Sequence, residues 1–162
     1  MEMIEGCDCK VKRTRLVRTV DWLCGALLIG ITVWVACRYA ALPDKIPTHF
    51  GADGVVDGYS GKSMIWGLLA SMWVFVIVMS VAELFPIHWN VPVKVTKENH
   101  SRMMTLTWHF ISTTKLLVAS LFACVVIMCM RGENLSAWFM PIMLTVLCAN
   151  SLFWVVRLFQ AR

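Results

Sequence analysis

The sequence predicts an all-α integral membrane protein: a four-helix bundle with both termini in the cytoplasm and a structured first extracytoplasmic loop. The 162 residues are 59% hydrophobic and only 15% charged, whereas soluble domains carry about a quarter charged residues. Four apolar runs are each long enough for a bilayer span, which needs about 20 residues. Basic residues collect beside these runs, and this is the orientation signal of membrane proteins.

The chain divides into a basic cytoplasmic tail, residues 1–18, and one membrane domain, residues 19–162. The predicted spans cover about residues 20–39, 63–87, 105–130 and 137–159. Between them lie an outer loop, residues 40–62, and a cytoplasmic segment, residues 88–104. Within that segment Thr96 is predicted to cap a helix that leads directly into the third span, with Glu98 in the first turn.

The net charge of +5 comes from basic residues beside the spans. Basic clusters precede the first and third runs and follow the fourth, which places both termini in the cytoplasm. No basic stripe with interleaved aromatics is present, so the predicted partner is the lipid bilayer and not nucleic acid. A homo-oligomer is an open alternative, and no cofactor is predicted.

The outer loop holds the polar stretch Leu42 to Lys62. Pro43 and Pro47 favour extended conformations in the residues before them. Asp53-Gly54 and Asp57-Gly58 are turn dipeptides. We therefore expect a compact loop with two successive tight turns.

Within this loop, His49, Asp53 and Asp57 are candidate ligands of a divalent cation, because imidazole and carboxylate groups suit such ions. Asp44 is a further candidate carboxylate for such a site, and His49 could instead form an acid–base pair with one of these aspartates. The alternative is structural: the aspartates cap turns, and His49 packs against Phe50 or hydrogen-bonds within the loop.

Ionisable side chains inside spans are costly and suggest a functional site. Glu83, His109 and Lys115 lie in the predicted inner half of the bilayer, and a Glu83–Lys115 pair would offset the cost of burying either charge. A structural pair or snorkelling toward the headgroups is the alternative. Asp21 is expected at the wet inner boundary, and Asn150 is expected to donate an interhelical hydrogen bond.

The stretch Leu42-Pro-Asp-Lys-Ile-Pro-Thr-His-Phe, followed by Gly54, Asp57-Gly58 and Lys62, resembles the signature of the membrane family called domain of unknown function 1648. Residues 90–99 and Lys115 are similar to what members carry after the second span, so the resemblance covers about residues 20–130. It implies a multi-pass protein of a bacterial or archaeal inner membrane. The same domain forms the N-terminal part of Sdp-type immunity proteins, whose additional C-terminal membrane domain is not expected in this chain.

Three functions stay open. The first is a non-enzymatic module for binding, immunity or signalling, in which the outer loop contacts a peptide, a lipid or a partner protein. Its candidate residues are Pro43, Asp44, Pro47, His49, Phe50, Gly54, Asp57 and Gly58. The second is a small oligomeric transporter with a polar site at Glu83, His109 and Lys115. The third is a metal-dependent membrane enzyme centred on His49. No catalytic motif is present, so the first is preferred.

Overall fold

The computed structural model describes residues 12–85, 93 and 95–161. Within these residues four helices are each long and apolar enough to cross a membrane, which confirms the predicted fold class. The helices are α1 (Arg15–Arg38), α2 (Met64–Ala82), α3 (His100–Arg131) and α4 (Phe139–Phe159), with the short 3-10 helix η1 (Tyr39–Ala41) after α1. Strands β1 (Lys45–Phe50) and β2 (Val56–Gly61) form an antiparallel pair.

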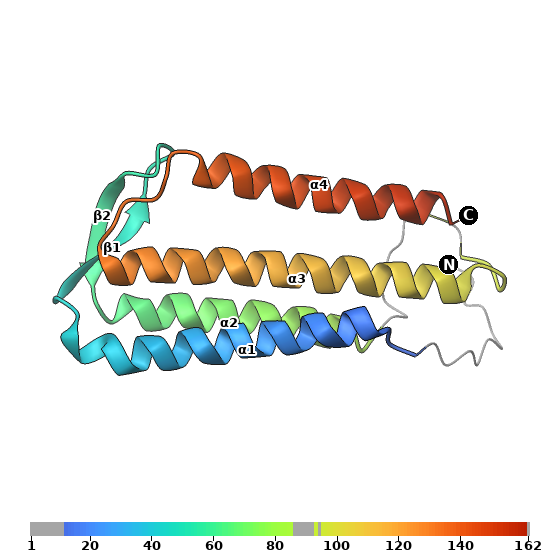
Figure 1. Cartoon of the computed structure of the whole chain (residues 1–162), viewed down its shortest axis with the longest axis horizontal. Helices are drawn as coiled ribbons and strands as arrows, with labels where there is room; N and C mark the ends of the chain where they lie inside the picture. Colours follow the sequence, from blue (N-terminus) through green and yellow to red (C-terminus); the bar gives the residue numbers. More distant parts are fainter. Residues whose placement is uncertain (1–11, 86–92, 94, 162) are drawn as a thin grey trace.

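The helices run side by side along the long axis, and the two strands lie together at one end (Figure 1). The α3 helix packs against each of the other three helices, while α4 lies alongside α3 on the face away from α1 and α2 (Figure 1). The start of α1, the start of α3 and the end of α4 lie at the end opposite the strands (Figure 1). The prediction that this end is cytoplasmic is not tested by the structure.

The α1 helix begins where Thr14 accepts a hydrogen bond from the Val17 backbone N–H, 3.3 Å away. This side-chain cap satisfies an amide that has no partner within the helix. The buried residues of α1 recur at intervals of three and four, so they form one stripe along the helix. They are Val17, Val20, Cys24, Leu28, Ile31 and Val35.

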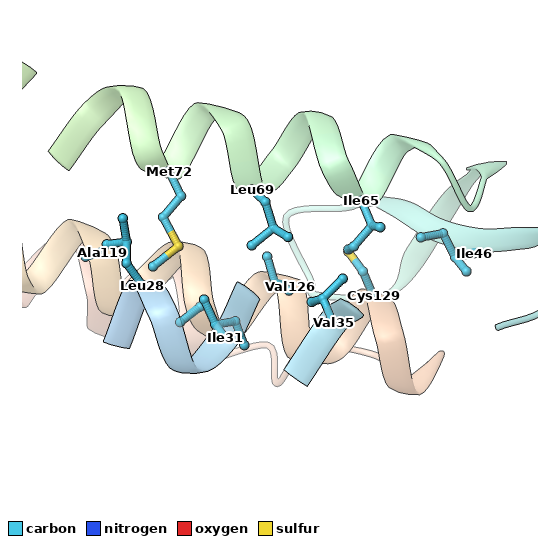
Figure 2. Packing of buried hydrophobic residues seen from close by; sticks show 11 residues of the cluster. Leu28, Ile31, Val35, Ile46, Ile65, Leu69, Met72, Ala119, Val126 and Cys129 are labelled. Atoms are coloured by element: carbon cyan, nitrogen blue, oxygen red, sulfur yellow. The ribbon is translucent and has the colours of Figure 1, made fainter. Parts of the chain in front are cut away.

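Leu28, Ile31 and Val35 of this stripe pack into a core built from α1, α2 and α3 (Figure 2). Ala119 and Ala123 of α3 are buried, and their small side chains let the neighbouring helices approach closely. Ile46 of β1 joins the same core, where it is 1% exposed. The core therefore fixes the base of the strand pair as well as the helices.

The helix ends differ by a few residues from the predicted spans, whose bounds in a membrane stay a prediction. The α1 helix begins at Arg15, α2 ends at Ala82 and α4 begins at Phe139, where the predicted bounds were about 20, 87 and 137. The α3 helix begins at His100, because the predicted helix before the third span is continuous with that span.

The predicted cap was wrong by three residues: Asn99, not Thr96, is the N-cap of α3, and Glu98 lies before the helix and not in its first turn. Thr96 and Asn99 instead close the turn before the helix, where the Thr96 hydroxyl accepts from the Asn99 backbone N–H and the Thr96 N–H donates to the Asn99 side chain. Residues 1–11, 86–92 and 94, which hold much of the predicted tail and cytoplasmic segment, lie outside the described residues.

The outer loop is a β-hairpin, which the sequence did not predict. The prediction of two tight turns was half right, because Asp53-Gly54 lies in the turn and Asp57-Gly58 lies inside β2. Gly58 faces His49 across the pair, and a Cβ atom at Gly58 would lie only 2.9 Å from the Cβ of His49. The second Asp-Gly dipeptide thus permits a close approach of the two strands, not a turn.

Candidate functional site

The hairpin is docked at both of its ends. At its base, Ile46 is buried in the helical core, and Pro47 beside it is buried as well. At its tip, the Gly54 carbonyl accepts a hydrogen bond from the Leu135 backbone N–H, 2.9 Å away. The Asn134 side chain accepts another from the Val56 backbone N–H, 3.0 Å away. The hairpin is therefore held against the α3–α4 connection and does not hang from the helix ends.

Gly54 is required for this docking on two grounds. Its φ is +81°, a conformation that residues with a side chain rarely adopt. A Cβ at this position would also lie 2.4 Å from the Leu135 carbonyl oxygen, well inside contact distance. The docking thus accounts for one of the predicted motif residues in purely structural terms.

His49 and Asp57 form a pair on the outer surface of the hairpin. The His49 Nδ1 atom lies 2.5 Å from the Asp57 Oδ1 atom, and the two side chains are 74% and 52% exposed. Tyr59, further along β2, is 65% exposed. Exposed ion pairs add little to stability, typically about 0–1 kcal/mol. These side chains are consequently available for contacts with a partner.

The other polar candidates of the loop have local roles. The Asp44 carboxylate lies 3.2 Å from the Lys62 ammonium, away from the His49 pair. Asp53 accepts a hydrogen bond from the Val55 backbone N–H, as expected of a turn-capping aspartate. Phe50 packs against the helical core, whereas Pro43 is exposed before β1. Within the described residues, no group of three or more His, Cys, Asp or Glu side chains is placed to hold a metal ion.

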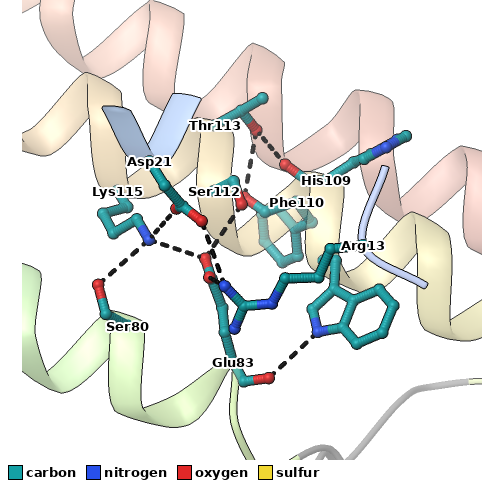
Figure 3. Close-up of polar contacts among 10 residues, drawn as sticks. Arg13, Asp21, Ser80, Glu83, His109, Phe110, Ser112, Thr113 and Lys115 are labelled. Carbon is teal, nitrogen blue, oxygen red and sulfur yellow. Dashed lines mark hydrogen bonds and ion pairs between the residues drawn. The ribbon is translucent and has the colours of Figure 1, made fainter. Parts of the chain in front are cut away.

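A second polar site is buried where α1, α2 and α3 meet (Figure 3), toward the start of α1, the end of α2 and the middle of α3. The Lys115 ammonium donates to Asp21 Oδ1 at 2.7 Å, to Glu83 Oε1 at 3.0 Å and to the Ser80 hydroxyl at 3.2 Å. These three acceptors match the three donors of an ammonium group. Lys115 and Glu83 are each 1% exposed, so the predicted Glu83–Lys115 pair is confirmed.

Further contacts extend this buried site, which we call the charge cluster: Arg13, Asp21, Glu83 and Lys115. Arg13 Nη1 lies 3.3 Å from Asp21 Oδ2 and 3.7 Å from Glu83 Oε2. The Ser112 hydroxyl donates to Glu83 Oε1, 3.0 Å away. Two cations thus alternate with two anions, and the charge cluster carries no net formal charge.

The other predicted polar residues in or near this region are Asp21, His109 and Asn150. Asp21 was expected at the wet inner boundary; its side chain is 28% exposed, and it also binds Lys115 and Arg13, which was not predicted. His109 does not join the charge cluster: its Nε2 atom lies 2.8 Å from the Thr14 hydroxyl and its ring packs on Trp154. Asn150 of α4 donates to the Thr114 hydroxyl of α3 at 3.0 Å, as predicted.

Arg13 and Asp21 were missed as members of the charge cluster. The sequence signal for Asp21 was that this acidic residue lies three positions after Arg18, at the start of an apolar run. Nothing local in the sequence says that this carboxylate meets Lys115, which is 94 residues away. The packing of α1 on α3 makes that contact.

Residues 26–73 match the family model described as domain of unknown function (DUF1648). The match confirms the family resemblance, and it runs from α1 through the hairpin into α2. It includes the His49–Asp57 pair and excludes Glu83 and Lys115. No curated protein and no solved structure matches the chain.

Proposed function

We propose that this chain, which carries a DUF1648 segment, is a non-enzymatic membrane module that binds an extracytoplasmic polypeptide through its hairpin. One observation carries the proposal: the hairpin is fixed at its base and tip, yet leaves His49, Asp57 and Tyr59 exposed. Immunity and signalling accessory roles, which the family resemblance implies, would both use such a binding step.

Fixing the hairpin lowers the cost of binding. A mobile loop loses conformational freedom when a partner orders it, at about 0.5–1.5 kcal/mol for each immobilised side chain in addition to the backbone. Here Ile46 and the hydrogen bonds at Gly54 and Val56 already order the backbone. The partner therefore meets a preformed surface.

A polypeptide suits this surface better than a lipid. Among the described residues β1 and β2 pair only with each other, so each strand has an edge without a strand partner. Such an edge offers backbone donors and acceptors to an added strand. His49 and Asp57 then supply a charged or hydrogen-bonding contact, and Tyr59 supplies an aromatic one.

The orientation in the membrane follows from the distribution of charge. Lys12, Arg15 and Arg18 lie at the end of the bundle opposite the hairpin, with Arg102 and Arg157 toward the same end. Because basic residues favour the cytoplasmic side, this end faces the cytoplasm and the hairpin faces outward. The proposal therefore places the protein in a cell membrane with its binding surface outside.

The test is photocrosslinking from the hairpin in the native host. A photoreactive phenylalanine analogue at position 59 is expected to form one discrete polypeptide adduct, and the same probe at Val74, an exposed site within α2, is the control. Replacing His49 and Asp57 together by Ala is expected to remove the adduct. The exposed Asp44→Ala variant serves as a matched control, because Asp44 also forms an ion pair in this loop.

The outcomes separate binding from folding. The His49→Ala, Asp57→Ala chain is expected to keep the thermal stability of the wild-type chain within about 1 kcal/mol, since the pair is exposed. An adduct that survives this double substitution, or no adduct from position 59, would overturn the proposal.

A further inference from the structure

A groove of about 450 Å³ lies between α1 and α2, away from the hairpin. Its walls are apolar and include Leu28 and Ile29 of α1 and Val76 and Ile77 of α2. At one end it reaches Asp21 and Lys115 of the charge cluster. Both helices are candidate membrane spans, so the groove opens toward the hydrocarbon of the bilayer.

Gly25 lies in the wall of this groove, in the middle of α1. A glycine inside a helix costs about 1 kcal/mol relative to alanine. No atom of the described chain lies within 4 Å of where its Cβ would be, so close packing inside the protein does not explain the glycine. The absent side chain instead deepens the groove and leaves room for an occupant.

The charge beside the groove favours an anion. Arg18 precedes Gly25 by seven residues, or two helical turns, and so lies on the same face of α1. It is exposed, and within the described part of the chain it forms no ion pair. The charge cluster is internally neutral, whereas Lys12, Arg15 and Arg18 leave a net positive charge at this end.

The groove together with the turn of α1 before it corresponds in length to one leaflet. On α1 the groove is lined from Asp21 to Ile29, and Arg18 lies three residues beyond this lining. Arg18 and Ile29 are 11 residues apart, which is about 16 Å along a helix axis. Half of a hydrocarbon core is about 15 Å thick. A lipid whose phosphate lies at Arg18 can therefore extend one acyl chain along the whole groove.

We propose that this groove binds one anionic phospholipid. Its phosphate lies on Arg18, and one acyl chain lies beside Gly25 between α1 and α2. A neutral or zwitterionic headgroup lacks the net charge that the basic residues of α1 attract, so phosphatidylglycerol binds in preference to phosphatidylcholine.

The site is tested by native mass spectrometry. The purified full-length chain in detergent is titrated with each of these two lipids. The Gly25→Leu variant places a side chain in the groove at a position where its Cβ meets no atom within 4 Å, and it is expected to weaken phosphatidylglycerol binding at least tenfold. Gly30→Leu is the matched control, because Gly30 is also in open space on α1 but does not line this groove. Binding by this control is expected to equal that of the wild type.

The headgroup contact is tested separately. An Arg or Lys near a membrane surface attracts an anionic lipid by about 1 kcal/mol, so Arg18→Gln is expected to weaken phosphatidylglycerol binding about fivefold and to leave phosphatidylcholine binding unchanged. Equal binding of the two lipids by the wild type, or unchanged binding by Gly25→Leu, would overturn the proposal. The proposal would also be overturned if the wild type formed a dimer without bound lipid and Gly25→Leu dissociated that dimer, because a second chain would then occupy the groove.

Discussion

Replacing Lys115 by Met removes the ammonium group that joins α1 and α2 to α3. The side chain is 1% exposed and donates to two carboxylates, at 2.7 Å and 3.0 Å. At an effective dielectric constant of about 20, unit charges about 3 Å apart attract each other by about 5 kcal/mol before desolvation is counted. Met fills a similar volume, so the substitution tests the charge and not the packing.

The expected loss of stability is large, because the partners stay behind. Glu83 has a side chain that is 0% exposed, so without Lys115 it is a buried carboxylate that keeps the Ser112 hydroxyl and the Arg13 guanidinium, 3.7 Å away, as partners. Removing one member of a buried pair typically destabilises a protein by about 3–5 kcal/mol. We expect Lys115→Met to lower the free energy of unfolding by an amount in that range.

The assay is equilibrium unfolding of the purified chain in mixed micelles of a mild detergent and sodium dodecyl sulfate. Lys62→Met is the matched control: Lys62 pairs with Asp44 at the surface, where Asp44 is 96% exposed, and should cost less than about 1 kcal/mol. Adding Glu83→Gln to Lys115→Met should recover part of the loss, with a coupling energy of about 2–3 kcal/mol. Equal costs for Lys115→Met and Lys62→Met would refute the reasoning.

Two further predictions concern the hairpin. Gly54→Ala combines backbone strain of roughly 1–2 kcal/mol with a clash against Leu135, and it should accelerate amide exchange at Val56 and Leu135. Gly132→Ala is the control and should show the strain alone, because the φ of Gly132 is +70° but its Cβ would meet no atom within 4 Å. Equal amide exchange at Leu135 in both variants would contradict the docking. The orientation is tested with single cysteines at Tyr59 and Arg18 in a variant without native cysteines: a membrane-impermeant maleimide added to intact cells should label position 59 and spare position 18, and the reverse pattern would place the hairpin inside.

The sequence predicted those features that a short segment of chain decides by itself. Apolar runs of sufficient length gave the four spans, because the bilayer sets their length directly. Glu83 and Lys115 could be paired in advance because neighbouring antiparallel spans place them at similar depth. That a helix begins after Thr96 was predictable for the same reason, although the cap lies at Asn99, three residues further along the chain.

The features that were missed depend on distant contacts. Asp21 joins the charge cluster through the packing of α1 on α3, and the hairpin tip docks on Asn134 and Leu135 through backbone groups that carry no side-chain signature. Glycine is used in proteins either where φ is positive, as in a turn, or where two strands approach closely. Asp57-Gly58 was assigned to a turn because the sequence does not show which strand lies opposite Gly58. Only the fold decides between these uses.

The charge cluster also bears on how the hairpin is held. Lys115 meets Asp21 of α1 and Glu83 beside the end of α2, so these contacts fix the depth and rotation of both helices against α3. A slip of α1 by one helical turn is a shift of about 5.4 Å, which would separate Asp21 from the ammonium. At the other end of α3, Val126 and Cys129 share the core with Ile46 of β1 (Figure 2). The register set at the charge cluster is therefore carried by α3 to the surface on which the hairpin rests, and a loosened charge cluster should also loosen the proposed binding surface.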